Sequence, residues 1–258
     1  MACNDDWHVA ECRKGAARRG KQASNPQLDS HQVSDCKPDK QTIINAMNEL
    51  RGENFWMEWK VYQTDKLFCT TLVISSQLFI SLVCLGHFAS CVSARYQLAM
   101  LSCDDPVFSE SECDALKELG FTVLTENEEG KRAVYQPTLF YLMHCGKALY
   151  NNLLWRKWTP QTLPKMIIIG NSFHGIQEWM LQREFERDYS FLSNVASVCD
   201  ETSLPCSPRF LDVFSDTALI QFPLENWNKL PECMWTEPSE PLYQHCQDLE
   251  IIQKEKRS

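Results

Sequence analysis

Three short polar segments each follow a run of apolar residues, and their side chains could bind a ligand. If the apolar runs are strands of a doubly wound sheet, ligands are expected beyond the carboxyl ends of these strands. We therefore predict ligand-binding residues in all three segments. The segments are Gly86-His87, His144-Cys145-Gly146 and Gly170-Asn171-Ser172.

The segment after "KMIII" carries residues that suit an anion. Asn171 or Ser172 could cap a helix whose free backbone N–H groups then face a phosphate or a carboxylate. Ordinary turn and capping chemistry explains the same residues, because most strand-to-helix junctions use them. The sequence holds no GxGxxG and no GxxxxGK[ST], so a dinucleotide site or a P-loop lacks its motif.

The histidines and cysteines suggest two other kinds of site. His144 and Cys145 could form a base and a nucleophile, but neighbours on a strand point to opposite faces and rarely meet. A haem iron needs only one His or Cys on an apolar wall, which His87, His144 or Cys145 could supply, and core residues that bind nothing fit the same pattern. The sequence has no CxxC and no HxxxH, and we predict no metal site.

A pair of carboxylates stands at Asp104 and Asp105, followed by Pro106. Two neighbouring carboxylates are the minimum for acid–base chemistry or for a divalent cation. Pro106 restricts Asp105 to an extended conformation, which also suits a loop that leads into a helix. We include Asp105 among the ligand-binding residues, and we predict no catalytic residue.

These segments have to be positioned by alternating strands and helices. Apolar runs predict strands, and between them Ser109 with Glu112 has the spacing of a capping box, with Gly120 as the stop. Alternation of this kind predicts a Rossmann-like α/β fold, a mostly parallel sheet with helices on both faces. The strands are expected at residues 78–85, 121–124, 138–143, 165–170 and 218–222.

The composition limits the class of protein. With 258 residues, a net charge of −9 and a pI near 5.2, the chain has no general basic surface for nucleic acid, although five basic residues lie between Arg13 and Lys21. Those five fit a solvated arm or a nuclear-import patch. The thirteen cysteines have no repeated spacing, which favours reduced thiols in a cytoplasmic protein.

The chain is expected to hold a single α/β domain behind a polar arm. We assign residues 1–40 to a disordered arm, 41–76 to a helical lead-in and 77–258 to the domain. The N-terminus lacks the apolar region of a signal peptide. The 28 residues between Lys66 and Arg95 carry no charge and are long enough to cross a bilayer, but polar residues divide them into runs typical of buried strands. We predict no membrane insertion.

Several motifs resemble the SRR-like family, named for a plant protein whose loss gives sensitivity to red light reduced. They occur in order over residues 77 to 252. The motifs are "LVCLGHFASCVSARYQLAM", "DPVFSESE", "TVLTENEEGKR", "PTLFYLMHCGKALYNNLLW", "IIIGNSF" and "QDLEII".

The resemblance implies a regulatory protein without an established reaction. Members of the family are linked to biological rhythms through the circadian clock, and animal members to control of clock gene expression and of haem biosynthesis. A cytoplasmic location, with the nucleus as a second one, and unidentified regulatory protein partners follow from it. The alternative function is an enzyme or sensor that binds a phosphate-bearing small molecule at the strand-to-helix loops.

The sequence departs from the family in two places. The first loop keeps one glycine, Gly86, where the family has two. Only "AMLSCD" separates "ARYQL" from "DPVF", where the family has a longer helix and a further strand. A parallel crossover needs a dozen or more residues, so we expect one strand to be missing between Leu98 and Asp105.

Overall fold

The structure is a computed structural model of the whole chain. The chain divides into residues 1–36 and 37–258, and every described residue belongs to the second unit. The structure describes residues 71–76, 100–103, 110–118, 121–124, 126–133, 135–227, 230–235 and 239–246, with isolated positions 41, 44, 45, 48, 53, 54, 58, 249 and 251.

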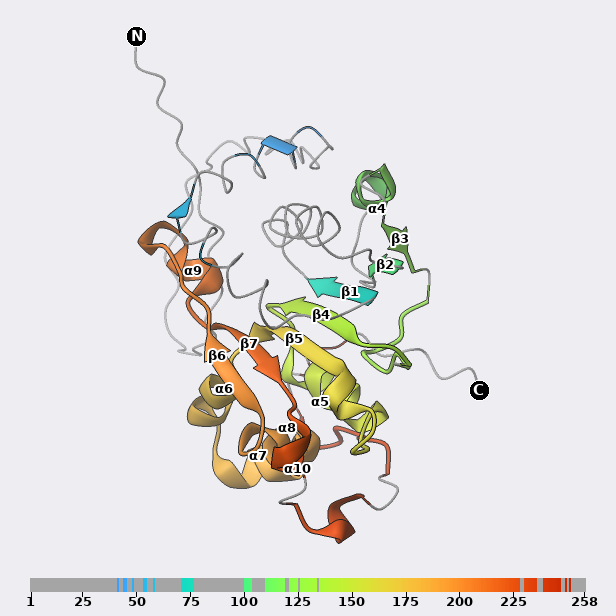
Figure 1. Cartoon of the computed structure of the whole chain (residues 1–258), viewed down its shortest axis with the longest axis vertical. Helices are drawn as coiled ribbons and strands as arrows, with labels where there is room; N and C mark the ends of the chain where they lie inside the picture. The colour runs from blue at the N-terminus through green and yellow to red at the C-terminus, as the bar shows by residue number, and fades with distance from the viewer. Residues whose placement is uncertain are drawn as a thin grey trace, which may run out of the picture. The chain divides into compact units, whose positions relative to one another are not determined.

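Within the described residues, seven strands form one sheet in the order β3-β2-β1-β4-β5-β7-β6 (Figure 1). The four pairings among β1, β2, β3, β4 and β5 are parallel, whereas β7 is antiparallel to both β5 and β6. The sheet is therefore mixed. The strands are β1 (Thr71–Ser76), β2 (Met100–Cys103), β3 (Thr122–Val123), β4 (Thr138–Met143), β5 (Met166–Asn171), β6 (Asp200–Ser203) and β7 (Thr217–Gln221).

The helices follow from the connections between parallel strands. A right-handed crossover puts the helix between β4 and β5 on one face and the helix between β2 and β3 on the other. Figure 1 shows α5 below the sheet and α4 above it. The helices are α4 (Glu110–Glu118), α5 (Lys147–Arg156), α6 (Phe173–Trp179), α7 (Gln182–Asp188), α8 (Ser190–Ala196), α9 (Leu211–Phe214) and α10 (Leu224–Trp227), with short 3-10 turns at Leu163–Lys165, Pro208–Phe210 and Glu232–Trp235.

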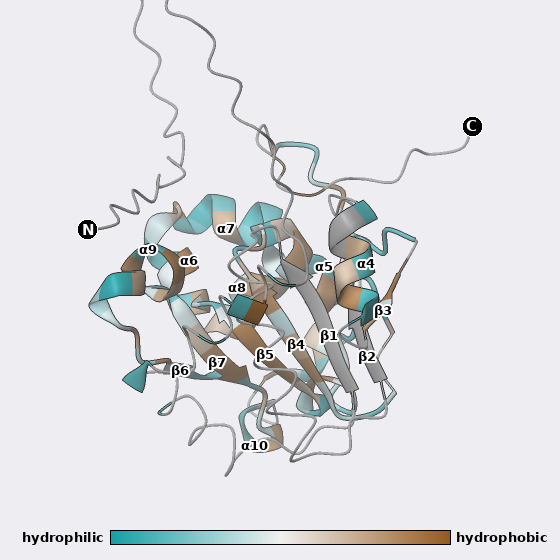
Figure 2. Cartoon of the chain, turned by 90° about the horizontal axis from the view of Figure 1, so that it is seen from above, coloured by the Kyte–Doolittle hydropathy of each residue, from teal (hydrophilic) through white to brown (hydrophobic). Residues whose placement is uncertain are grey.

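The core lies where α5 and α8 pack on the central strands. All six residues of β4 are buried, as the continuous apolar run "TLFYLM" predicts for a strand covered on both faces. Figure 2 shows hydrophobic residues along β4, β5 and β7 and hydrophilic ones on α7. At one end of the core, Trp158 packs edge-to-face on Phe191 and Trp227, with ring centroids 5.1 and 6.3 Å away.

Two strands differ from the sequence-based expectation at the start of the sheet. We expected the first strand at residues 78–85, which lie outside the described part of the chain, and β1 instead occupies residues 71–76, which we assigned to the lead-in. The prediction that no strand lies between Leu98 and Asp105 is wrong, because Met100–Cys103 form β2. The earlier position of β1 leaves residues 77–99 for the crossover, which is enough.

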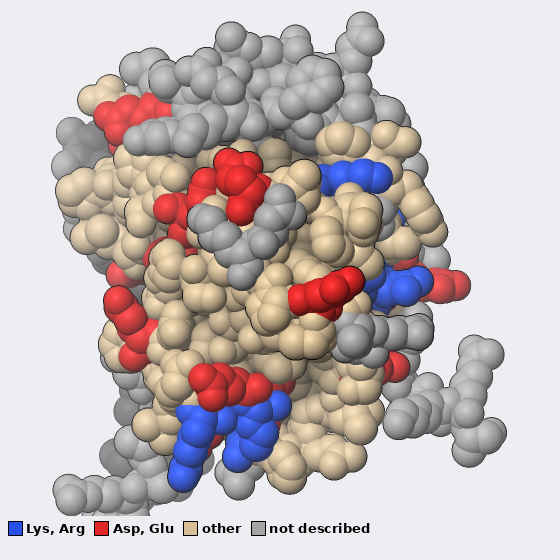
Figure 3. All heavy atoms as spheres, turned by 60° about the horizontal axis from the view of Figure 1, so that its bottom comes forward, with Lys and Arg blue, Asp and Glu red and all other residues tan. Residues whose placement is uncertain are grey.

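Charged side chains on one face of the molecule are unevenly distributed. On the face shown in Figure 3, Asp and Glu side chains are scattered over several places, and the described Lys and Arg side chains form no continuous basic surface there. No helix within the described ranges is long and apolar enough to cross a membrane.

One cation is buried beside the sheet. Lys157, at the end of α5, is only 2% exposed, and its Nζ lies 5.3 Å from the centre of the Phe140 ring in β4. The ammonium donates hydrogen bonds to the backbone carbonyls of Arg132 and, at 3.5 Å, Leu153. Burial, followed by the charge of Arg156, lowers the pKa of Lys157 to about 7.

Lys157 should make the free energy of unfolding depend on pH. The folded chain releases the lysine proton near pH 7 and the unfolded chain only near 10.5, so stability rises with pH between these values. Over pH 7–9, denaturant unfolding of Lys157→Met should lack a rise of about 1.4 kcal/mol per pH unit that the native chain shows. Lys165→Met, at an exposed lysine, is the control. Parallel pH profiles for native chain and Lys157→Met would contradict this.

Candidate functional site

The carboxyl edge of the central strands brings together most of the described residues that we predicted to bind a ligand. The strand order reverses between β1 and β4, and such a switch point is where open α/β sheets bind ligands. His144 and Cys145 follow β4, and Asn171 ends β5. Thr217, the first residue of the antiparallel strand β7, pairs with Asn171. Asp216, which precedes it, therefore lies at the same edge.

A buried tyrosine connects the strands at this edge. The Tyr150 hydroxyl, from α5, lies within hydrogen-bonding distance of the Leu142 carbonyl in β4 and of Asn171 Oδ1 at 2.9 Å, and it accepts the Asn171 backbone N–H at 2.9 Å. Asn171 Nδ2 then donates to Asp216 Oδ2 at 2.8 Å. Burial raises the pKa of Tyr150 well above its usual range, which keeps the hydroxyl neutral.

Gly170 is required by the close approach of this hydroxyl. A Cβ at Gly170 would meet the Leu142 carbonyl oxygen at 2.6 Å and would come still closer to the Tyr150 hydroxyl. No side chain fits there, so the glycine serves packing between α5, β4 and β5. We predicted Gly170 to be a ligand-binding residue, and a direct contact with a ligand stays a prediction.

A carboxylate of the chain itself occupies the start of α6. Ser172 caps this helix, as predicted, because its Oγ accepts the Gly175 N–H at 2.8 Å. Glu201 Oε2, from β6, accepts the backbone N–H groups of Phe173 at 2.8 Å and His174 at 3.2 Å, and the Ser172 hydroxyl donates to Oε1. The Glu201 side chain is only 4% exposed.

This arrangement opposes binding of the anion that we expected at residues 170–172. The amides that would hold a phosphate are already bonded to Glu201, and a second anion there would face a buried carboxylate. Phosphate binding at this loop therefore requires Glu201 to leave. The predicted capping role of Ser172 is confirmed, whereas a ligand at Asn171 or Ser172 stays a prediction.

His144 has an uncommon backbone and an unsatisfied ring nitrogen. Its φ of 57° lies in the left-handed region that residues other than glycine rarely adopt. Its Nε2 is buried and has no hydrogen-bond partner within the part of the chain that the structure describes. Burial lowers the pKa of His144, against the opposing effects of Asp216 and of a hydrogen bond to the Val213 backbone, so the ring is neutral near pH 7.

Neither His144 nor Cys145 presents an open position for a haem. The nitrogen of His144 that could bind iron is enclosed, and a porphyrin would reach it only after surrounding residues move. The Cys145 side chain is buried, and its Sγ lies 3.7 Å from the Met143 carbonyl. Haem therefore does not fit these two residues in this conformation. The described residues also contain no group of three metal-ligating side chains.

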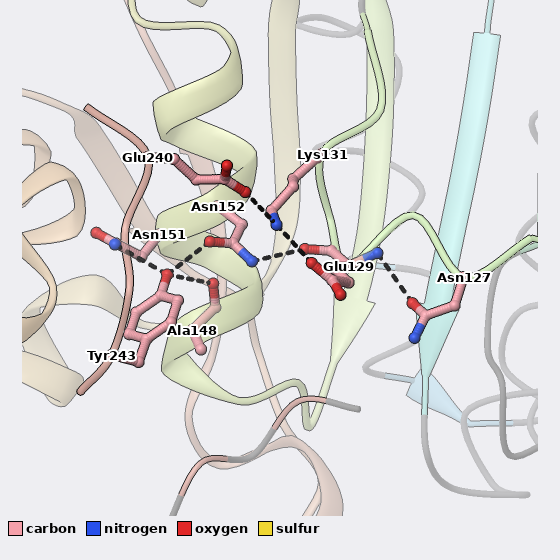
Figure 4. A network of polar contacts seen from close by, with 8 residues as sticks. All are labelled: Asn127, Glu129, Lys131, Ala148, Asn151, Asn152, Glu240 and Tyr243. Atoms are coloured by element: carbon pink, nitrogen blue, oxygen red, sulfur yellow. Dashed lines mark hydrogen bonds and ion pairs between the residues drawn. The ribbon is translucent and has the colours of Figure 1, made fainter. Parts of the chain in front are cut away.

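A second polar network fixes the helix that follows His144 and Cys145 (Figure 4). The Tyr243 hydroxyl lies 3.0 Å from the Ala148 carbonyl and 2.7 Å from Asn152 Oδ1, and it accepts Asn151 Nδ2 at 3.0 Å. Asn152 Nδ2 donates to the Glu129 carbonyl at 2.8 Å. The C-terminal segment thus binds α5, and the network holds the loop before β4 to the same helix.

Three predicted site residues lie outside the described part of the chain: Gly86, His87 and Asp105. Three others belong to the edge but were missed in the sequence: Tyr150, Glu201 and Asp216. Tyr150 stands within the quoted motif "GKALYNNLLW", where it looks like one more apolar helix residue. Asp216 immediately precedes an apolar run, a signal that becomes informative only once β7 is known to be antiparallel.

Comparison with known proteins identifies related sequences. The family model described as SRR1 domain matches residues 74–221. The SRR1-like protein of Mus musculus is 47% identical over 139 residues, covering 47% of this chain and 56% of the mouse protein. That of Drosophila melanogaster is 34% identical over 136 residues, covering 51% and 46%. Protein SENSITIVITY TO RED LIGHT REDUCED 1 of Arabidopsis thaliana is 34% identical over 123 residues, covering 42% and 45%.

The matches cover only part of this chain and part of each relative. The chain spans about half the length of the curated relatives it matches. The match to the family model ends at Gln221, the last residue of β7, so it includes the carboxyl edge. Among solved structures, the SAH-bound methyltransferase PaMTH1 of Podospora anserina aligns with a TM-score of 0.40 and 10% identity, over 78% of this chain and 100% of that one, which is too distant to show a shared fold.

Gly170→Ala should destabilise the protein through overpacking. The added methyl group has to displace Tyr150 or Leu142, which should lower the free energy of unfolding by about 2 kcal/mol or more. Gly175→Ala is a milder comparison: its Cβ would lie 3.2 Å from Ser172 Oγ, a tight contact that a small shift of this side chain relieves, and alanine favours a helix. Denaturant unfolding measures both. In a Tyr150→Phe background the cost of Gly170→Ala should fall, and an unchanged cost would exclude the hydroxyl as its cause.

Glu201→Ala should cost about 2–3 kcal/mol of stability, because two α6 amides and the Ser172 hydroxyl lose a charged acceptor in a buried position. Glu201→Gln keeps one acceptor oxygen and should cost less. Glu186→Ala removes an exposed carboxylate from α7 and should change stability by at most about 0.5 kcal/mol. Equal melting temperatures for Glu201→Ala and Glu186→Ala would show that Glu201 does not hold the helix.

Proposed function

Since the chain belongs to the SRR1 domain family, we propose that it is a regulatory protein that acts in control of circadian clock gene expression and of haem biosynthesis. The observation that carries this proposal is the match over residues 74–221, which spans β2 to β7 and the whole described carboxyl edge. The plant relative is named for a reduced sensitivity to red light, which supports a regulatory role.

Regulation of this kind works through protein partners, and one surface supports such contacts. Trp179, the last residue of α6, and Leu181, which precedes α7, are 91% and 62% exposed. Large apolar side chains that protrude into water are typical of protein-binding positions, where tryptophan often carries much of the binding energy. We propose action in the cytoplasm and the nucleus through such partners, without direct contact with nucleic acid, because the net charge is −9.

We propose that a small molecule that binds at the carboxyl edge regulates the protein. His144 combines a left-handed backbone with a buried, unpaired nitrogen at the switch point of the sheet. Strained residues and unsatisfied polar groups persist mainly at positions that bind or react. A sensor for a small molecule is therefore favoured at this edge, whether or not the domain also catalyses a reaction.

The test is restoration of function in cells. Mouse cells that lack their SRR1-like protein would receive this chain together with a luciferase reporter driven by a clock gene promoter. We expect the chain to restore the amplitude of the rhythm and the transcript levels of haem-biosynthetic enzymes. The same cells without the added chain serve as the negative control. A folded, well-expressed native chain that restores neither readout would contradict the proposed function.

A further inference from the structure

Two large apolar side chains, Trp179 and Leu181, protrude from the corner between α6 and α7. The backbone is extended at Met180, with φ −111° and ψ 150°, and at Leu181, with φ −66° and ψ 127°. Successive side chains of an extended segment point to opposite sides. Met180 accordingly packs against the core, whereas Trp179 and Leu181 are 91% and 62% exposed. The local backbone therefore holds both apolar side chains on the outside.

One charge stands on each side of this corner, and each opposes the helix end on which it lies. Glu178 is in the last turn of α6, whose carbonyl end is negative, and Arg183 is in the first turn of α7, whose amide end is positive. Both side chains are exposed, and neither forms a hydrogen bond or an ion pair with another described residue. Helix stability alone would favour the opposite charges here. The described contacts thus give Glu178 and Arg183 no role in the fold.

The order of these residues along the chain is self-complementary. A two-fold contact uses the same patch on both copies, and segments that cross the axis run antiparallel to each other. From Glu178 to Arg183 the chain reads negative, three apolar residues, polar, positive. Packing that puts Trp179 of one copy on Leu181 of the other therefore brings Glu178 towards Arg183 of the partner subunit, and it does so on both sides of the axis.

We propose that the corner between α6 and α7 is the contact between two copies of this chain, with Trp179 packed on Leu181 of the partner subunit and Glu178 paired with Arg183 of the partner subunit. This inference rests on the proposed role of Trp179 and Leu181 in protein binding, and it names the partner as a second copy. The two unpaired charges favour this partner, because a second copy supplies the opposite charge to each of them.

The size of the apolar patch predicts a weak, reversible dimer. A tryptophan contributes about 200 Å² of buried surface, whereas stable interfaces bury about 1,200 Å² or more in total. Two tryptophans and two leucines stay below that value, so we expect a dissociation constant of about 10 to 300 µM. A dimer of this strength covers the corner at high local concentration and frees it on dilution.

The test is analytical ultracentrifugation of the full chain at concentrations up to about 300 µM in about 0.15 M salt. The native chain should form a dimer in a concentration-dependent way. Trp179→Ser should weaken this association by about tenfold or more, because it removes the aromatic anchor from both copies. Tyr135→Ser is the matched control: it removes an aromatic side chain that is 79% exposed in the loop before β4, and this variant should dimerise as the native chain does.

Charge reversal tests how the two copies are oriented. Glu178→Lys and Arg183→Glu should each weaken the dimer by about threefold or more, although they change the net charge in opposite directions, and the double variant should restore the native affinity. Each substitution places the charge that its helix end prefers, so neither should lower the melting temperature. Glu225→Lys changes the net charge as Glu178→Lys does, at an exposed position on α10, and should leave the dimer unchanged.

Three results would overturn the inference. The first is a native chain that stays monomeric at about 300 µM, which would leave the corner to a different protein. The others are a dimer that tolerates Trp179→Ser and a double variant that fails to restore association. The cellular reporter does not measure association. A monomeric chain that restores the rhythm would therefore refute only the dimer, and a dimeric chain that does not restore it would refute only the proposed function.

Discussion

The fold depends on one close approach, that of the Tyr150 hydroxyl to the backbone of β4 and β5. The contact is possible because residue 170 has no side chain. The contact holds α5 against both strands. Asn171, whose side-chain oxygen lies beside this hydroxyl, also donates a hydrogen bond to Asp216 in the segment before β7. Buried polar groups are costly unless all are paired, and here a single hydroxyl from α5 contacts polar groups of two strands. Hydrogen bonds therefore link α5, β4 and β5 at the edge where β4 leads into His144.

Hydrogen bonds also explain how the chain tolerates two carboxylates at one end of the sheet. The Glu201 side chain is buried, but a hydroxyl and two helix amides donate hydrogen bonds to its carboxylate. Asp216 remains exposed and is oriented by Asn171. The positive end of α6 is thus neutralised internally, and the negative charge that faces solvent comes from Asp216. The division of roles follows from burial, because only the carboxylate inside the protein needs the helix amides.

Long apolar runs and a helix cap could be predicted from the sequence, whereas short polar strands could not. Residues 138–143 form β4 at the expected bounds, and Ser172 caps α6 as expected. The sequence "DETS" of β6 has no apolar alternation, so only its pairing with β7 makes it a strand. Asp216 escaped notice for a related reason: its place at the edge results from an antiparallel direction that no local pattern encodes.

For His144 the position could be predicted from the sequence, but the conformation could not. Its residue type and its position after β4 could be predicted from sequence, but the left-handed backbone and the unpaired Nε2 depend on the packing around the residue. Glycine would adopt this backbone without strain, and a smaller apolar residue would leave no orphan acceptor. A chain selected for stability alone would use one of these. The imidazole therefore points to a role outside the fold.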